Sequence, residues 1–350
     1  MSTPSRLLEA SGICLAALAL AACAPEFDRP SELRTLRVLA VQKDKPYALP
    51  GDTVNLEMLW HDGLYREGST EERRNVQIGW LSGCFDPPAD LYRNCFSELR
   101  DPQLVTCSSD SGEPCEHFSF VMPQDVISRR PPPADTTQPP YGIAYVFFAL
   151  CAGELGFADP GSGESAFPIL CLDADRNALG PNHFVAGYST VFSYDRFANQ
   201  NPVLTGFEFN GEPMPAAQIC IGTECQDKVF PEFECGAGPC VDTCADDGDR
   251  EECDGTEFRP IVDRESAELD EVSLQTRGRR LGEQMWINYY VDRGGVKSDV
   301  RLLNDAVTGW NDDYGTEFYA PKDPGRSRIW AVVHDNRGGM SWASIVVNVE

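Results

Sequence analysis

The residues Tyr141-Gly-Ile-Ala-Tyr-Val-Phe-Phe-Ala-Leu-Cys151 decide the fold class of this 350-residue chain, because nearly all of them are apolar or aromatic. Pro139-Pro140 comes directly before the run and cannot continue a strand or a helix. A short, continuous apolar run of this kind is typical of a central β-strand that is buried on both faces. We therefore expect a β-sheet protein with this segment in the middle of a sheet.

Other segments alternate apolar and polar residues with the period of a half-buried strand. Val54, Leu56, Met58 and Trp60, for example, share one strand face. Further strands are expected at 36–40, 76–80, 118–120, 185–194, 203–209, 272–274, 285–291, 300–303, 329–333 and 343–349. Turn signals such as Asn210-Gly211 separate them, and no helical periodicity extends over ten or more residues.

This pattern predicts an all-β fold of two Ig-like β-sandwich domains. Asn199-Gln200-Asn201-Pro202 is the expected junction, which gives a first domain at 35–198 and a second at 199–350. Residues 213–257 are rich in cysteine and lack apolar periodicity. We expect them to form an irregular insert in the second domain, held by disulfides rather than by a core.

The N-terminus has the pattern of a bacterial lipoprotein signal. Arg6 precedes a short apolar segment, which ends in Leu20-Ala-Ala-Cys23 with small residues before the cysteine. We expect removal of residues 1–22, lipidation of Cys23 and a tether at 23–34. Ala24, where an aspartate would favour the inner membrane, favours a lipid-anchored protein of the cell outer membrane. An ordinary secretory signal is the alternative.

The chain holds 14 cysteines, of which Cys14 and Cys23 belong to the signal and the anchor. The twelve remaining cysteines are an even number, and in an exported protein they are expected to form structural disulfides. Two sets of six are the candidates, and spacing alone leaves their pairing open: Cys84, Cys95, Cys107, Cys115, Cys151 and Cys171, then Cys220, Cys225, Cys235, Cys240, Cys244 and Cys253. Zinc is disfavoured because no Cys-x-x-Cys pair occurs and the four histidines are scattered.

The chain is strongly acidic, with 55 Asp and Glu against 29 Lys and Arg and a net charge of −26. Such a surface excludes nucleic acid as a partner, because binding phosphates demands clustered cations. It would also be repelled by anionic lipid head groups, so the acyl chains are the expected contact with the membrane.

The acidic residues are densest in the insert. Asp246, Asp247, Asp249 and Glu251 offer the carboxylate oxygens that calcium prefers, although the EF-hand spacing is absent. The alternative that we favour is a solvated acidic loop. A second group, 173–177 with the pattern Asp-x-Asp-x-Asn, is expected to be a polar turn.

No catalytic motif is present: Gly-x-Ser-x-Gly and His-Glu-x-x-His are both missing. Gly161–Ser165 lacks the lysine of a phosphate-binding loop, and a surface turn accounts for His334-Asp335. We expect most tryptophans to lie in the core. We therefore predict that the protein is not an enzyme and needs no cofactor. The alternative is an envelope hydrolase that acts on glycans through paired carboxylates.

Several short stretches resemble uncharacterised Ig-like lipoproteins of myxobacteria and their relatives. They are 36–41, 50–54, 148–153, 199–202 and 330–339, and the last also looks like the end of polycystic-kidney-disease-type and cadherin-like sandwiches. The resemblance implies an Ig-like architecture and a place in the envelope, and it supplies no catalytic residues. From the sequence as a whole we predict a lipid-anchored envelope protein with a binding, adhesion or structural role and a protein or glycan partner.

Overall fold

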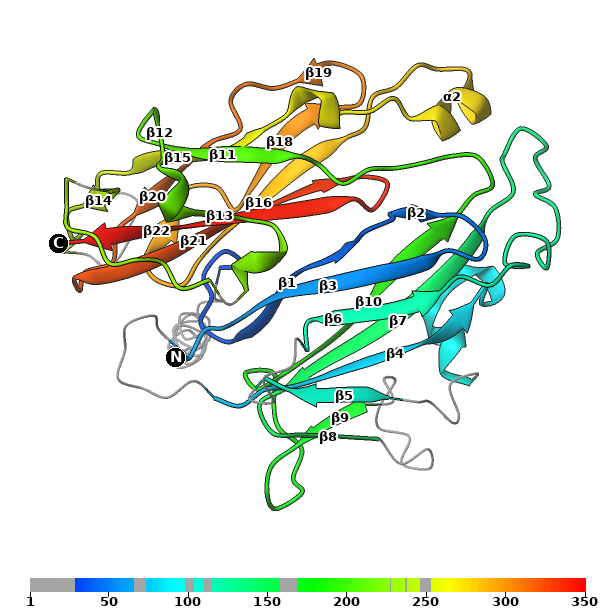
Figure 1. Cartoon of the computed structure of the whole chain (residues 1–350), viewed down its shortest axis with the longest axis horizontal. Helices are drawn as coiled ribbons and strands as arrows, with labels where there is room; N and C mark the ends of the chain where they lie inside the picture. Colours follow the sequence, from blue (N-terminus) through cyan, green and yellow to red (C-terminus); the bar gives the residue numbers. More distant parts are fainter. Residues whose placement is uncertain are drawn as a thin grey trace, which may run out of the picture. The chain divides into compact units, whose positions relative to one another are not determined.

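The computed structural model describes residues 29–65, 74–97, 104–109, 115–157, 169–226, 228–236, 238–245 and 253–350. Ser31–Glu350 forms one compact unit. This unit contains two β-sandwiches that follow one another in the chain (Figure 1), so the predicted all-β, two-sandwich fold is confirmed. Among the described residues, no helix has the length and apolarity that crossing a membrane requires.

The first sandwich has the strand order of an Ig-like domain. One sheet has the order β1 (Leu36–Lys43), β3 (Thr53–Asp62), β6 (His117–Val121). The other has the order β2 (Tyr47–Ala48), β10 (Phe184–Ser193), β7 (Gly142–Cys151), β4 (Gln77–Phe85), β5 (Val105–Ser108). The strand β2 runs parallel to β10, as the split first strand of Ig-like domains does, and β8 (Glu154–Phe157) and β9 (Ile169–Leu172) form a hairpin after β7.

The central strand β7 is buried along its whole length, as its sequence predicts. One face, with Val146 and Phe148, packs in the core between the two sheets. The other face, with Phe147, is covered by the 3-10 turns η1 (Pro88–Asp90) and η2 (Tyr92–Ser97). The Cys84–Cys95 disulfide ties this covering segment to β4.

The second sandwich repeats the same order of strands. One sheet has the order β12 (Glu212–Pro213), β11 (Leu204–Phe209), β15 (Thr256–Val262), β20 (Thr316–Tyr319), β17 (Gly295–Val296). The other contains, in order, β22 (Met340–Val349), β21 (Gly325–Asp335), β16 (Met285–Val291), β18 (Val300–Asp305), β19 (Gly309–Trp310). Phe207, Phe258 and Tyr289 fill the core between them.

The insert between β12 and β15 corrects our expectation that disulfides alone hold it. Its strands β13 (Ile219–Ile221) and β14 (Cys240–Val241) both pair with β22 and so cover the edge of that sheet. The turns η3 (Ala216–Gln218) and η4 (Thr223–Cys225) flank β13. Phe230 is only 2% exposed, so the insert also contributes to a core.

Residues 272–274, predicted as strand, are helical instead. They lie in α2 (Glu271–Arg277), which follows the short turn η5 (Arg264–Ser266). The Asp270 carboxylate accepts a hydrogen bond from the backbone N–H of Ser273 at 2.9 Å, and Gly278 ends the helix with φ 61°. These are the N-cap and C-cap residues that favour a helix, and they outweigh the β-propensity of Val272.

A separate hydrophobic core lies between the two sandwiches. Leu39 and Leu59 of the first sandwich pack with Trp330 and Trp342 of the second and with Phe230 of the insert. The folded unit also begins earlier than the expected first strand. Residues 31–34, the last four of the expected tether, belong to it, since Leu33 is 1% exposed and bonds to Val291.

All twelve candidate cysteines form disulfides, and each pairs with its neighbour in sequence order. The pairs are Cys84–Cys95, Cys107–Cys115, Cys151–Cys171, Cys220–Cys225, Cys235–Cys240 and Cys244–Cys253. The potential metal-ligand group Cys235, Cys240 and Glu350 therefore offers no thiolate to a metal.

Candidate functional site

A pocket of about 320 Å³ opens where the two sandwiches and the insert meet. We call it the seam pocket. Its lining comes from the end of β3, from the insert and from β21, and includes His61, Asp62, Lys228, Arg326, Arg328 and Trp330. This volume falls at the lower end of the range of small-ligand sites, and clefts between domains are a common place for such sites.

Rigid contacts hold the walls of the seam pocket in place. The Gln226 side-chain oxygen accepts a hydrogen bond from the backbone N–H of Trp60 at 3.0 Å. Arg328 donates to the carbonyl oxygen of Cys225 and, at 3.1 Å, to the Ser344 hydroxyl. The insert is therefore fastened to both sandwiches at the pocket, and the Cys220–Cys225 disulfide stiffens the same segment.

Aromatic rings form the floor of the seam pocket. The ring centroids of His61 and Trp330 lie 4.9 Å apart. The Arg328 guanidinium carbon lies 5.2 Å from the Trp330 ring centroid and 5.1 Å from that of Phe230. These contacts, together with its hydrogen bonds to Cys225 and Ser344, hold the Arg328 guanidinium in place beside the pocket.

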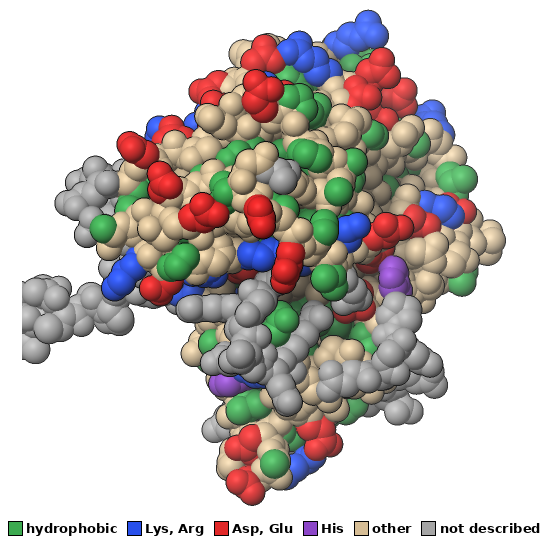
Figure 2. Space-filling model, turned by 60° about the vertical axis from the view of Figure 1, so that its left-hand side comes forward, with side chains coloured by type: hydrophobic (Ala, Val, Ile, Leu, Met, Phe, Trp, Pro, Cys, Tyr) green, Lys and Arg blue, Asp and Glu red, His purple; other side chains and the backbone are tan. Residues whose placement is uncertain are grey.

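The charge of the pocket differs from that of the chain as a whole. Acidic side chains are spread over the face drawn in Figure 2, with fewer Lys and Arg side chains between them. The pocket instead gathers three cationic side chains, Lys228, Arg326 and Arg328, against the carboxylates of Asp62 and Asp292. A local reversal of charge in an acidic protein is a feature of a site for anions.

Asp62 already has a cationic partner of its own. Its two carboxylate oxygens accept hydrogen bonds from Arg74 at 2.8 and 2.5 Å, and the carboxylate side chain is 2% exposed. Arg74 also contacts Nδ1 of His183 at 2.7 Å. The bidentate pair neutralises Asp62, so its charge does not cancel that of the cations in the pocket.

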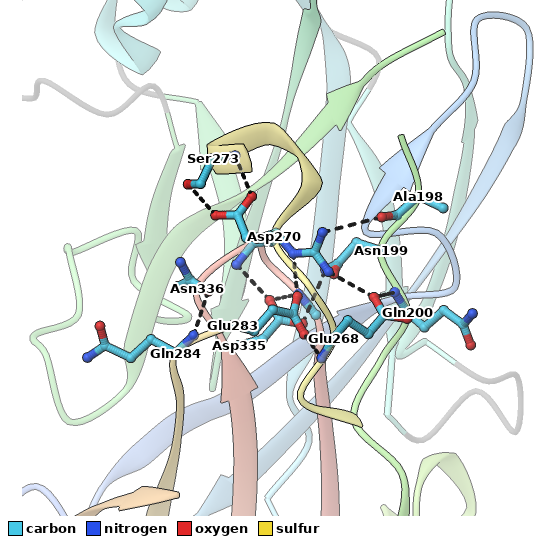
Figure 3. A network of polar contacts seen from close by, with 12 residues as sticks. Ala198, Asn199, Gln200, Glu268, Asp270, Ser273, Glu283, Gln284, Asp335 and Asn336 are labelled. Carbon is cyan, nitrogen blue, oxygen red and sulfur yellow. Dashed lines mark hydrogen bonds and ion pairs between the residues drawn. The ribbon is translucent and has the colours of Figure 1, made fainter. Parts of the chain in front are cut away.

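A second polar cluster, the junction network, lies where the β21–β22 hairpin meets the chain between the sandwiches (Figure 3). Arg337 forms ion pairs with Glu283, which is fully buried, and at 2.8 Å with Glu268. Asp335 accepts hydrogen bonds from the backbone N–H of Arg337 at 2.7 Å and from the Asn199 amide at 3.1 Å. These contacts join the junction to the hairpin, which makes the network a structural element.

The junction network also corrects our interpretation of His334-Asp335 as a surface turn, because Asp335 is 3% exposed. Burial and the nearby charge of Lys43 lower the pKa of His334 to about 4. Lys43 is buried as well, and burial lowers its pKa to about 8 although Asp335 opposes the shift. The Gln42 side-chain amide donates a hydrogen bond to the carbonyl oxygen of Met340 at 2.7 Å, so this hairpin contacts the first sandwich directly.

Glu57 and Glu116 form the acidic pair that bears most closely on the hydrolase alternative. Burial, and then the charge of Glu116, raise the pKa of Glu57 to about 7. Glu116 accepts a hydrogen bond from the Trp60 indole at 3.0 Å. A carboxyl group that stays protonated near neutral pH is a feature of a general acid. Neither glutamate lines the seam pocket.

Glu57→Gln should make the protein more stable above neutral pH. The folded-state pKa of Glu57 is raised, so its ionisation costs stability as the pH rises from about 4.5 to 7. We expect the variant to gain on the order of 1–3 kcal/mol over the native protein at pH 8 and nothing at pH 4. Urea unfolding at both values measures this, with the exposed Glu212→Gln as control. An equal gain at pH 4 would contradict the ionisation argument.

The predicted site residues divide into those that the structure describes and those that it does not. Cys23, the calcium candidates Asp246, Asp247, Asp249 and Glu251, and the loop 161–165 lie outside the described residues. The 173–177 group is the polar turn that we predicted. Asp173 accepts hydrogen bonds from the backbone N–H groups of Asp175 and Asn177 at 2.9 and 2.8 Å.

The seam pocket itself was not predicted from the sequence. Arg326, Arg328 and Trp330 alternate along β21, so their common face is readable from a period of two. What the alternation cannot show is that the insert and β3 meet that face. The four tryptophans Trp60, Trp80, Trp330 and Trp342 are at most 2% exposed, which confirms their expected place in the core.

No protein-family model and no curated protein matches the chain. Solved structures to which it is similar include the fibronectin(III)-like modules of Clostridium thermocellum CbhA, at 9% identity over 89% of this chain and 93% of that one, with a TM-score of 0.19. Dimeric latent PorU from Porphyromonas gingivalis follows at 11% identity, over 93% of this chain and 25% of that one, with a TM-score of 0.18. Scores this low support no argument about function, and the order of the strands defines the Ig-like fold.

Proposed function

We propose that this protein is a lipid-anchored envelope protein that acts as a non-enzymatic binding, adhesion or structural module, with binding as the favoured role. The seam pocket is the observation that carries the binding role. A core shared by the two sandwiches and the insert holds its walls, and the Cys220–Cys225 disulfide stiffens the insert. Binding sites on such rigid scaffolds need little ordering when the ligand arrives.

The anchor is supported by the sequence Leu20-Ala-Ala-Cys23 and by its distance from the folded unit. Ser31 is eight residues after Cys23, which lets the unit lie at most about 28 Å from the lipid-bearing residue. A lipid on Cys23 would therefore tether the folded unit to the membrane. The partner in this proposal is a protein or a glycan of the envelope.

Cys23→Ser should release the protein from membranes. The thiol is the only proposed acylation site, and two or more acyl chains give stable anchoring that the acidic folded unit cannot replace. We expect the native protein in the membrane fraction and labelled by a fatty-acid analogue, and the variant soluble and unlabelled. Cys14→Ser, within the signal, is the matched control. Equal labelling of both variants and the native protein would reject the anchor.

The hydrolase remains the second candidate because of the pKa of Glu57, about 7, which suits a general acid. If Glu57 acts as that acid, purified protein should release reducing ends from envelope glycans, and Glu57→Gln should abolish the release. The binding proposal predicts no release by either protein.

A further inference from the structure

We propose that the seam pocket binds a small carboxylate ligand with a flat apolar side, as a uronic-acid sugar presents. This inference rests on the proposed binding role and names the ligand class for it. It follows from three properties of the pocket: the charge of its lining, the aromatic floor and the size.

The charge of the lining selects an anion. Lys228, Arg326 and Arg328 face the pocket, while Asp62 is neutralised by its bidentate pair with Arg74. Asp292 accepts a hydrogen bond from the backbone N–H of Arg328 at 2.8 Å. Among the described residues that line the pocket, together with Arg74, four cations stand against two anions, whereas the whole chain carries −26.

The aromatic floor selects a ligand with a flat side. His61, which is half-buried, presents its ring to the pocket, and the buried Trp330 ring lies behind it and beside the Arg328 guanidinium at 5.2 Å. A planar guanidinium matches the geometry of a carboxylate better than a flexible ammonium does. The ring of a sugar acid offers both features, since its carboxylate reaches the cations while its C–H side packs against the half-buried His61 ring.

The size of the pocket excludes a folded partner. A volume of about 320 Å³ accommodates a small molecule or one end of a chain. Val229, which is 83% exposed, lies at the pocket and leaves the rim open to solvent. A terminal uronic acid of a longer glycan fits this arrangement, whereas a protein surface would need an interface several times larger.

Calorimetric titration of the full-length protein in detergent tests the inference with matched ligands. Galacturonate and galactose share a ring and differ in the carboxylate, and acetate has the carboxylate without the ring. We expect saturable binding of galacturonate about tenfold tighter than that of galactose, as loss of a charge-assisted contact predicts, and none of acetate. Raising the salt concentration should weaken the binding.

Lys228→Gln tests the assignment of the site, because this exposed side chain can change without disturbing the core. We expect it to weaken galacturonate binding about three- to tenfold. Lys322→Gln, an equal change of charge at an exposed lysine that does not line the pocket, should leave binding unchanged. Equal affinities for galacturonate and galactose, no saturable binding, or equal loss in both variants would each overturn the inference.

The outcome is separable from the fate of the proposed function. If galacturonate fails to bind while Cys23→Ser still releases the protein from membranes, the ligand class is wrong and the envelope role stands. If galacturonate binds while Cys23 carries no lipid, the pocket assignment survives and the anchor does not.

Discussion

Arg337→Met should lower the free energy of unfolding by about 3–5 kcal/mol, the usual cost of leaving one member of a buried ion pair without the other. Glu283 has no exposed side-chain surface and Arg337 only 5%. Burial and the charge of Asp335 already raise the pKa of Glu283 to about 7, although Arg337 opposes the shift. Without the guanidinium, the buried carboxylate of Glu283 loses its ion-pair partner.

The pH dependence of this variant provides a second readout. Because the folded-state pKa of Glu283 is raised, its ionisation lowers stability as the pH rises from about 4.5 towards and beyond 7. Removing Arg337 should raise that pKa further, so the deficit should be larger at pH 8 than at pH 5. Urea unfolding at the two values measures both effects.

Arg264→Met is the matched control, because Arg264 pairs with Asp312 and both side chains are well exposed, at 65% and 77%. A surface pair of this kind contributes at most about 1 kcal/mol. A similar, small loss for Arg337→Met would show that the junction network adds no more than a surface ion pair.

Local sequence patterns predicted most of the strands because the order of apolar and polar residues in a strand reflects which of its faces are buried. The alternation in Val54–Trp60 and the continuous apolar run before Cys151 each specify which faces are covered. The same logic failed at Val272, where the capping residues Asp270 and Gly278 decide in favour of helix. Those caps are visible in the sequence, whereas the prediction of a strand rested on the apolar residues Val272 and Leu274 alone.

Contacts between segments distant in sequence were beyond this reasoning. The insert shows no apolar periodicity because its strands are only two or three residues long. Their position is set by pairing with β22, which is distant in sequence. The seam pocket depends on three such segments meeting, and the burial of Asp335 depends on the first sandwich packing against the hairpin. Residue propensities and motif spacing do not predict such contacts between distant segments.

Trp330→Ala should test whether the two sandwiches unfold as one body. Trp330 is 2% exposed and lies in the core that Leu39, Leu59 and Phe230 share across the seam. Truncating a buried tryptophan costs about 3–5 kcal/mol through lost contacts and the cavity that remains. Since this cavity opens between the sandwiches, we expect one unfolding transition for the native protein and two for the variant, each with a smaller denaturant slope.

Trp330→Phe provides the comparison, because it keeps a ring against His61 and most of the shared core. We expect it to lose less stability than Trp330→Ala and to retain one transition. Since Trp330 also supports His61 at the seam pocket, galacturonate should stabilise Trp330→Phe more than Trp330→Ala. A loss below about 1 kcal/mol in Trp330→Ala, with one transition preserved, would mean that hydrogen bonds at the junction and not the shared core join the sandwiches.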